Sequence, residues 1–144
     1  MSMIVGGIVG LILTGLALLH LYWAGGGRFA ALAAVPEVSQ KPVFTASPGA
    51  CILVALFLGS AAAIVVMQAG LWAPSSVPRW VPALGSWVLA AIFALRALGD
   101  FRLVGFFKRV RGTRFARMDT VLYSPLSVLL AVGCGWVASA RGSP

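Results

Sequence analysis

The sequence predicts an all-α integral membrane protein, a bundle of four helices that each cross the bilayer. Its 144 residues are 60% hydrophobic and only 10% charged, whereas soluble domains carry about 25% charged residues. The mean hydropathy is +1.00, and the apolar residues gather in four runs, each close to the ~20 residues that span a hydrocarbon core. None of the runs alternates in polarity as barrel strands do. Helices are therefore favoured, because they satisfy their own backbone hydrogen bonds in lipid.

The four predicted spans follow one another in a single domain, residues 1–144. They are Met3 to Ala24, Cys51 to Trp72, Trp80 to Leu98, and Val121 to Ala140. The first lacks the charged segment of a signal peptide and exceeds its usual ~7–15 apolar residues, so we expect it to remain a span. The loop "APSSVPR" is short, which predicts an antiparallel hairpin of spans two and three. A basic loop, residues 99–119, separates spans three and four.

Small residues within the spans predict close helix contacts. Gly6 and Gly10 form a GxxxG pair in the first span, and "GSAAA", Gly59 to Ala63, is small on nearly every side of the second. Such faces allow helices to approach closely in lipid, either inside the bundle or in a homo-oligomer. The two cysteines, Cys51 and Cys134, lie in different spans without metal or redox spacing, and we interpret them as small buried residues.

The distribution of positive charge predicts the orientation in the membrane. Eight of the eleven Lys and Arg residues lie in the first and third loops, which should therefore face the cytoplasm. Only Arg79 and Arg141 fall on the other side, and Arg96 lies within a span. Both termini are then non-cytoplasmic, and the predicted location is the cytoplasmic (inner) membrane of a bacterium.

The third loop predicts contact with anionic lipids rather than with nucleic acid. Its basic residues alternate with four phenylalanines, as in segments that lie on a membrane surface. Each basic residue near an anionic leaflet adds about 1 kcal/mol of attraction. The predicted headgroup contacts are Arg102, Lys108, Arg109, Arg111, Arg114 and Arg117.

Polar side chains near the cytoplasmic ends of the spans predict a ligand pocket there, because ionisable residues within spans usually face the bundle interior. The candidate ligand-binding residues are His20, Trp23, Arg96, Asp100, Asp119 and Tyr123. Arg96 and Asp100 are four apart, so they share a helix face and could form a local pair instead. Asp119 could equally cap the last span. No set of residues predicts a metal or a cofactor.

Two motifs resemble a bacterial family of small four-span integral membrane proteins that carry a domain of unknown function. The motifs are "HLYWAGGG", His20 to Gly27, and "RALGDFRLVGFFKRVRGTRFARMDTVLYSP", Arg96 to Pro125. Met118 stands where the family pattern implies an aromatic residue. The resemblance implies the fold and the membrane location, and it implies no activity.

Three functions remain open from the sequence. We favour binding of a lipid or lipophilic small molecule at the cytoplasmic pocket, because Arg side chains suit phosphate and carboxylate groups. The alternatives are a small oligomeric transporter and an intramembrane enzyme. The enzyme would use His20 as acid or base with Asp100 or Asp119 as its partner. No nucleophile motif accompanies His20, so we do not assign a catalytic residue and favour a non-enzymatic role.

Overall fold

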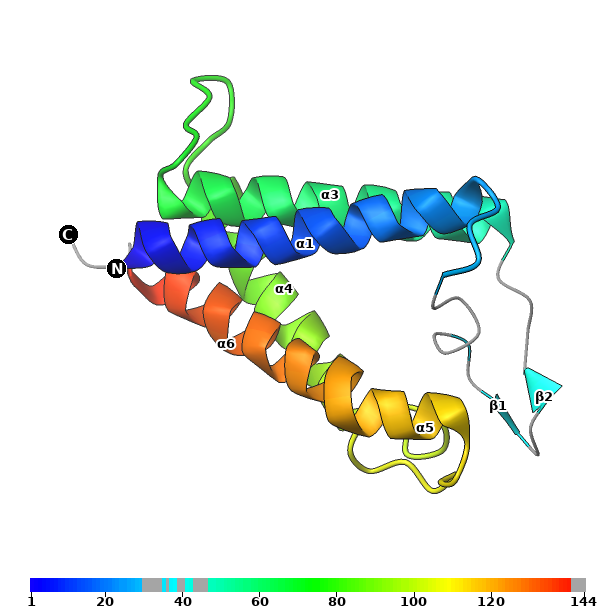
Figure 1. Ribbon diagram of the computed structural model, residues 1–144. Coiled ribbons are helices and arrows are strands. Elements are labelled where there is room, and N and C mark those ends of the chain that lie inside the picture. Colours follow the sequence, from blue (N-terminus) through cyan, green and yellow to red (C-terminus); the bar gives the residue numbers. More distant parts are fainter. Residues whose placement is uncertain (30–34, 36, 39–40, 43–46, 141–144) are drawn as a thin grey trace.

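The computed structural model of the protein describes residues 1–29, 35, 37–38, 41–42 and 47–140. Its long helices are α1 (Ser2–Ala24), α3 (Pro48–Ala69), α4 (Trp80–Leu98) and α6 (Ser124–Ala140) (Figure 1). Between α1 and α3, two-residue strands β1 (Glu37–Val38) and β2 (Lys41–Pro42) pair antiparallel. Helix α5 (Arg114–Met118) and a π-helical turn (Asp119–Tyr123) lead directly into α6.

Four helical segments are long and apolar enough to cross a membrane. They are α1, α3, α4 and the continuous run Arg114–Ala140. Large hydrophobic side chains are exposed on all of them, which is the surface that lipid solvates. The predicted all-α, four-span fold is confirmed, and the protein is a multi-pass membrane protein.

Hydropathy predicts the bounds of one helix, and side-chain caps determine where two others begin. The bounds of α4 are those predicted, Trp80 to Leu98. Helix α3 begins at Pro48 rather than Cys51, because the Ser47 side chain accepts the Ala50 amide. The last helical run begins at Arg114 rather than Val121, after the cap Thr113. The basic loop is therefore residues 99–113, shorter than predicted.

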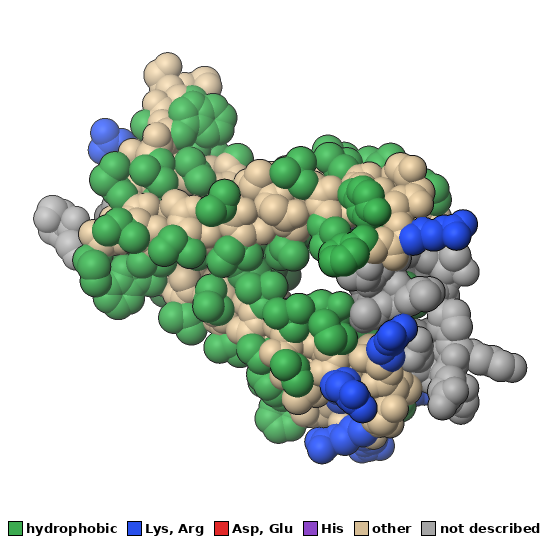
Figure 2. Space-filling view, in the orientation of Figure 1, with side chains coloured by type: hydrophobic (Ala, Val, Ile, Leu, Met, Phe, Trp, Pro, Cys, Tyr) green, Lys and Arg blue, Asp and Glu red, His purple; other side chains and the backbone are tan. Residues whose placement is uncertain are grey.

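The helices form two antiparallel pairs. Helix α1 lies along α3 and α4 lies along α6, and the pairs meet at one end and diverge toward the other (Figure 1). We call the first end, where α1 begins and α6 ends, the terminal end. The second, where the 99–113 loop lies, is the basic end. Figure 2 shows Lys and Arg side chains around the basic end and hydrophobic side chains along an opening between the pairs.

Glycines explain why the pairs meet at the terminal end. A Cβ on Gly6 would strike Ala69 of α3, with Val137 of α6 at 3.6 Å. A Cβ on Gly133 would lie 2.5 Å from Val9. Gly6 is buried, so it packs within the bundle. Of the two predicted roles of the small residues, bundle packing and homo-oligomer contact, Gly6 has the first. Cys51 and Cys134 are both buried and free.

We expect Gly6→Leu to lower the free energy of unfolding by about 1–3 kcal/mol, the usual cost of overpacking. Gly15→Leu in the same helix is the matched control, because nothing lies within 4 Å of a Cβ at that position. Removing an exposed helical glycine should leave stability unchanged or raise it by up to about 1 kcal/mol. Thermal unfolding in detergent, followed by circular dichroism, measures both. Equal losses in the two variants would contradict this packing.

Candidate functional site

A fully buried carboxylate lies at the centre of the basic end. Asp119 opens the π-helical turn, and its side chain has no exposed surface. Its Oδ1 accepts a hydrogen bond from Arg96 Nη2 at 3.0 Å. Its Oδ2 accepts from Lys108 Nζ at 2.9 Å and from the Gly105 amide at 2.8 Å. We call Arg96, Lys108 and Asp119 the Asp119 cluster; it holds two cations for one anion.

Lys108 belongs to this cluster rather than to the exposed surface. Its ammonium group donates to the Gly105 carbonyl at 3.0 Å and to Thr120 Oγ1 at 2.7 Å, besides Asp119. An ammonium has three hydrogens, so all its donors are used. The side chain is only 2% exposed. The structure therefore gives Lys108 a contact different from the predicted lipid headgroup.

Two glycines hold the 99–113 loop against the end of α4. Gly99 and Gly105 both have positive φ, +88° and +87°, and their backbones are in direct contact. Only glycine adopts this conformation without strain. Beyond them, the amides of Phe106 and Phe107 bond to the Ala97 and Leu98 carbonyls, which would otherwise end the helix unpaired. The loop thereby brings the Gly105 amide and Lys108 to Asp119.

Asp100 stabilises the same loop from its exposed side. Its Oδ1 accepts the amides of Arg102, Leu103 and Val104 at 2.7–2.9 Å. Burial opposes ionisation and is the largest single effect, but the backbone amides together outweigh it, and the pKa of Asp100 lies below its ordinary value of 3.8. The Asp100 carboxylate is therefore bonded to its own loop, and Arg96 forms its ion pair with Asp119 instead.

Arg96 keeps one unused donor group. Nη2 bonds to Asp119, whereas Nη1 is buried and has no partner among the described residues. A buried donor without a partner costs about 1–3 kcal/mol. The Arg96 side chain as a whole is 35% exposed.

His20 and Trp23 form a separate contact at the end of α1. The His20 ring nitrogen Nδ1 lies 2.8 Å from the Leu16 carbonyl, which can only accept, so Nδ1 carries the proton. The two rings pack edge to face, with centroids 4.9 Å apart. Trp23 Nε1 donates to the Phe29 carbonyl at 2.7 Å. The acids proposed as partners of His20, Asp100 and Asp119, both have other contacts among the described residues.

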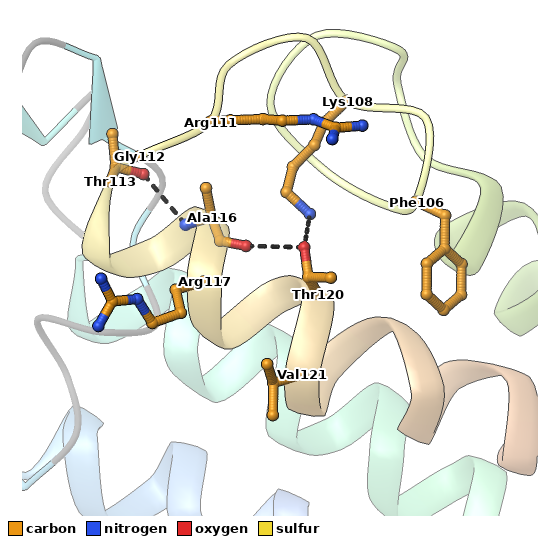
Figure 3. Close-up of a pocket in the computed structure, with 9 residues that line it drawn as sticks. All are labelled: Phe106, Lys108, Arg111, Gly112, Thr113, Ala116, Arg117, Thr120 and Val121. Atoms are coloured by element: carbon orange, nitrogen blue, oxygen red, sulfur yellow. Dashed lines mark hydrogen bonds between the residues drawn. The ribbon is translucent and has the colours of Figure 1, made fainter.

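A pocket of about 300 Å³ lies between the 99–113 loop and the start of the last helical run (Figure 3). Arg111 and Arg117 supply positive charge, and Phe106 and Val121 supply apolar wall. Thr113 lies at the edge of this pocket and caps α5 through a 3.0 Å bond to the Ala116 amide. The pocket thus combines cationic and apolar surface.

The structure brings together some of the predicted site residues and separates others. Arg96 and Asp119 are bonded, and Tyr123 follows one helical turn later, its ring 6.1 Å from that of Phe115. Asp100, His20 and Trp23 each bond elsewhere. Lys108 was predicted for a different role, and the contribution of Gly105 was not predicted. One feature of the sequence sets Lys108 apart from the predicted headgroup contacts: it is the only lysine in the loop, and the other basic residues are arginines.

The chain matches a known protein family. A family model described as "Protein of unknown function (DUF3995)" matches residues 13–134, a range that includes the Asp119 cluster and the whole 99–113 loop. No curated protein and no solved structure matches the chain. The match confirms the resemblance that the motifs predicted, and because it covers most of the 144 residues, the chain belongs to this family of unknown function, DUF3995.

Proposed function

We propose that the protein binds an anionic lipid at its basic end, in the cytoplasmic membrane of a bacterium, with the 99–113 loop on the cytoplasmic side. The observation that carries the proposal is the 300 Å³ pocket, in which basic and apolar residues line one volume. The headgroup phosphate lies against Arg111 and Arg117, and the acyl chains leave along Phe106 and Val121.

The charges around this pocket are arranged to favour an anion. Among the side chains that the structure describes, both ion pairs use Asp119, so neither Arg111 nor Arg117 has a carboxylate partner. Lys108 lines the pocket but is neutralised by Asp119, and it serves to hold the wall in place. Arginine binds phosphate through two parallel hydrogen bonds, which a surface lysine cannot reproduce.

The apolar side of the pocket points to a lipid rather than to a free anion. Val121 is 71% exposed and Phe106 is 41% exposed, although both are large hydrophobic residues beside the cationic groups. A free phosphate has no apolar part that could contact them. An anionic lipid covers them with its glycerol and acyl groups, and each buried CH₂ contributes about 0.8 kcal/mol.

Removing the two free arginines tests this proposal. We expect Arg111→Gln with Arg117→Gln to weaken binding of phosphatidylglycerol roughly tenfold or more, because each charge-assisted contact is worth about 1.5–3 kcal/mol. The measurement is native mass spectrometry of the purified protein titrated with phosphatidylglycerol or phosphatidylcholine. The wild type should retain the anionic lipid and discriminate against the zwitterionic one.

The matched control, Arg102→Gln with Arg109→Gln, removes the same charge from the basic end but outside the pocket. Both residues are exposed and neither lines the pocket. This control should bind phosphatidylglycerol almost as well as the wild type. An equal loss in both double variants would mean that only general surface charge attracts lipid, and the proposed site would be wrong.

The orientation is tested separately by cysteine labelling in a background with Cys51 and Cys134 replaced by alanine. We expect Arg109→Cys to be labelled by a membrane-impermeant maleimide only after cells are opened, because the basic loop faces the cytoplasm. Ser76→Cys, exposed in the loop at the terminal end, should be labelled in intact spheroplasts. The reverse pattern would overturn the orientation and leave the lipid pocket untouched.

A further inference from the structure

A second cavity, of about 830 Å³, lies at the terminal end, far along the bundle from the basic loop. It is formed by the last turn of α3, the loop 70–79 and the first turn of α4. Nothing in the lipid site at the basic end depends on it. Its lining contains one side-chain amide, one arginine and several large apolar side chains.

The amide belongs to Gln68 of α3. This residue is only 4% exposed, yet it lines the cavity. Within the part of the chain that the structure describes, no hydrogen bond involves its side chain. A glutamine amide offers two donors and an acceptor. Neither amide atom of Gln68 is among the buried, unpaired side-chain atoms, so both reach the surface of the cavity. Gln68 is therefore placed to bond to a polar group that enters the cavity.

The charge in the cavity favours an anion. Arg79 lines it immediately before α4, and this arginine takes part in neither of the ion pairs formed by described side chains. The first turn of α4 adds the positive end of a nineteen-residue helix dipole. Among the described residues, no carboxylate side chain lines the cavity. The last turn of α3 contributes the negative end of its own helix dipole, which opposes that of α4, so the Arg79 guanidinium supplies the net positive charge.

The remaining wall is apolar and aromatic. Met67 and Trp72 face the cavity from the α3 side, and Pro82 closes it from α4. Trp72 is 54% exposed, a large hydrophobic surface at the level where tryptophan meets the membrane interface. A ligand that satisfies Gln68 and Arg79 while covering Trp72 carries an anionic oxygen group next to an apolar chain.

We propose that this cavity is a second binding site, for an amphiphile whose carboxylate or phosphate oxygens contact Gln68 and Arg79 and whose apolar chain lies against Trp72 and Met67. The shared chemistry has two possible sources, a free fatty acid or the headgroup of an anionic lipid. Because the site lies at the opposite end from the basic loop, the protein would hold one amphiphile near each membrane face.

Quenching of tryptophan fluorescence by brominated amphiphiles tests the site in the full-length protein. The protein is placed in phosphatidylcholine nanodiscs and titrated with a dibrominated fatty acid, with dibrominated phosphatidylglycerol, or with dibrominated phosphatidylcholine. We expect saturable quenching by one of the two anionic probes, and the probe that saturates identifies the source of the anion. This saturable part should disappear in Trp72→Phe and persist in Trp136→Phe, which removes an exposed tryptophan that does not line the cavity.

Two further variants separate the polar contacts from general attraction. Gln68→Leu and Arg79→Gln should each weaken the saturable binding about tenfold, the effect of losing one charge-assisted hydrogen bond. Arg79 is exposed, so its variant tests the site even if Gln68→Leu fails to fold. Arg109→Gln, at the basic end, should bind like the wild type. Non-saturable quenching, equal quenching by the neutral probe, or unchanged affinity in Arg79→Gln would each overturn the proposal.

Discussion

Asp119→Asn is expected to lower the free energy of unfolding by about 3–5 kcal/mol, the range measured when one partner of a buried ion pair is removed. The asparagine has nearly the same shape, and its carbonyl can still accept the Gly105 amide. What it cannot do is neutralise Lys108 and Arg96, and the Lys108 side chain is only 2% exposed. Two cations would then face each other without a counter-charge. Equilibrium unfolding in mixed detergent measures the loss.

Asp100→Asn is the matched control for this variant, because it removes the same charge from the same region at an exposed position. We expect it to change stability by less than about 1 kcal/mol, since solvent screens exposed charges. Adding Lys108→Met to Asp119→Asn should restore part of the loss, because it removes the buried cation that Asp119→Asn leaves without a counter-charge. Equal effects of Asp119→Asn and Asp100→Asn would show that the Asp119 cluster does not hold the loop.

The four spans could be predicted because lipid exposure is a property of composition. A helix that meets hydrocarbon must be apolar over about 20 residues, and Trp80–Leu98 was found with the bounds that hydropathy predicts. The start of the last helical run was predicted at Val121 instead of Arg114 because that prediction also depended on hydropathy. Arg114 and Arg117 are exposed on helix α5 while Phe115 and Ala116 are buried, and a hydropathy window averages the two faces into a loop.

The partner of Arg96 could not be predicted from spacing alone. Positions 96 and 100 share a face only if the helix continues through both. Gly99 ends α4 with φ +88° and turns the chain, so Asp100 faces its own loop amides instead. Asp119 replaces it as the partner of Arg96 across a 23-residue separation. Such a contact depends on how the intervening loop closes, which no local pattern specifies.

The path of the loop depends on Gly105, and Gly105→Ala is expected to cost about 3 kcal/mol or more. Its φ of +87° strains any residue with a Cβ, and the added Cβ would strike the Leu98 carbonyl oxygen and the Gly99 Cα, both backbone atoms that cannot move aside cheaply. Displacing Gly105 also withdraws its amide from Asp119 and its carbonyl from Lys108. The single added methyl group should therefore break the hydrogen bonds that join Gly105 to Asp119 and Lys108 and expose the Asp119 cluster.

Gly112→Ala separates backbone strain from this collision. Gly112 has nearly the same φ, +88°, in the same loop, but nothing lies within 4 Å of a Cβ there, so its cost should be only about 1–2 kcal/mol. Lysine acetylation followed by mass spectrometry reports on the cluster directly, because Lys108 is almost fully buried when the loop is docked. Lys108 should stay protected in the wild type and in Gly112→Ala, and should react readily in Gly105→Ala. Protection in all three proteins, with equal stabilities for the two variants, would mean that the Gly99–Gly105 contact does not position Lys108.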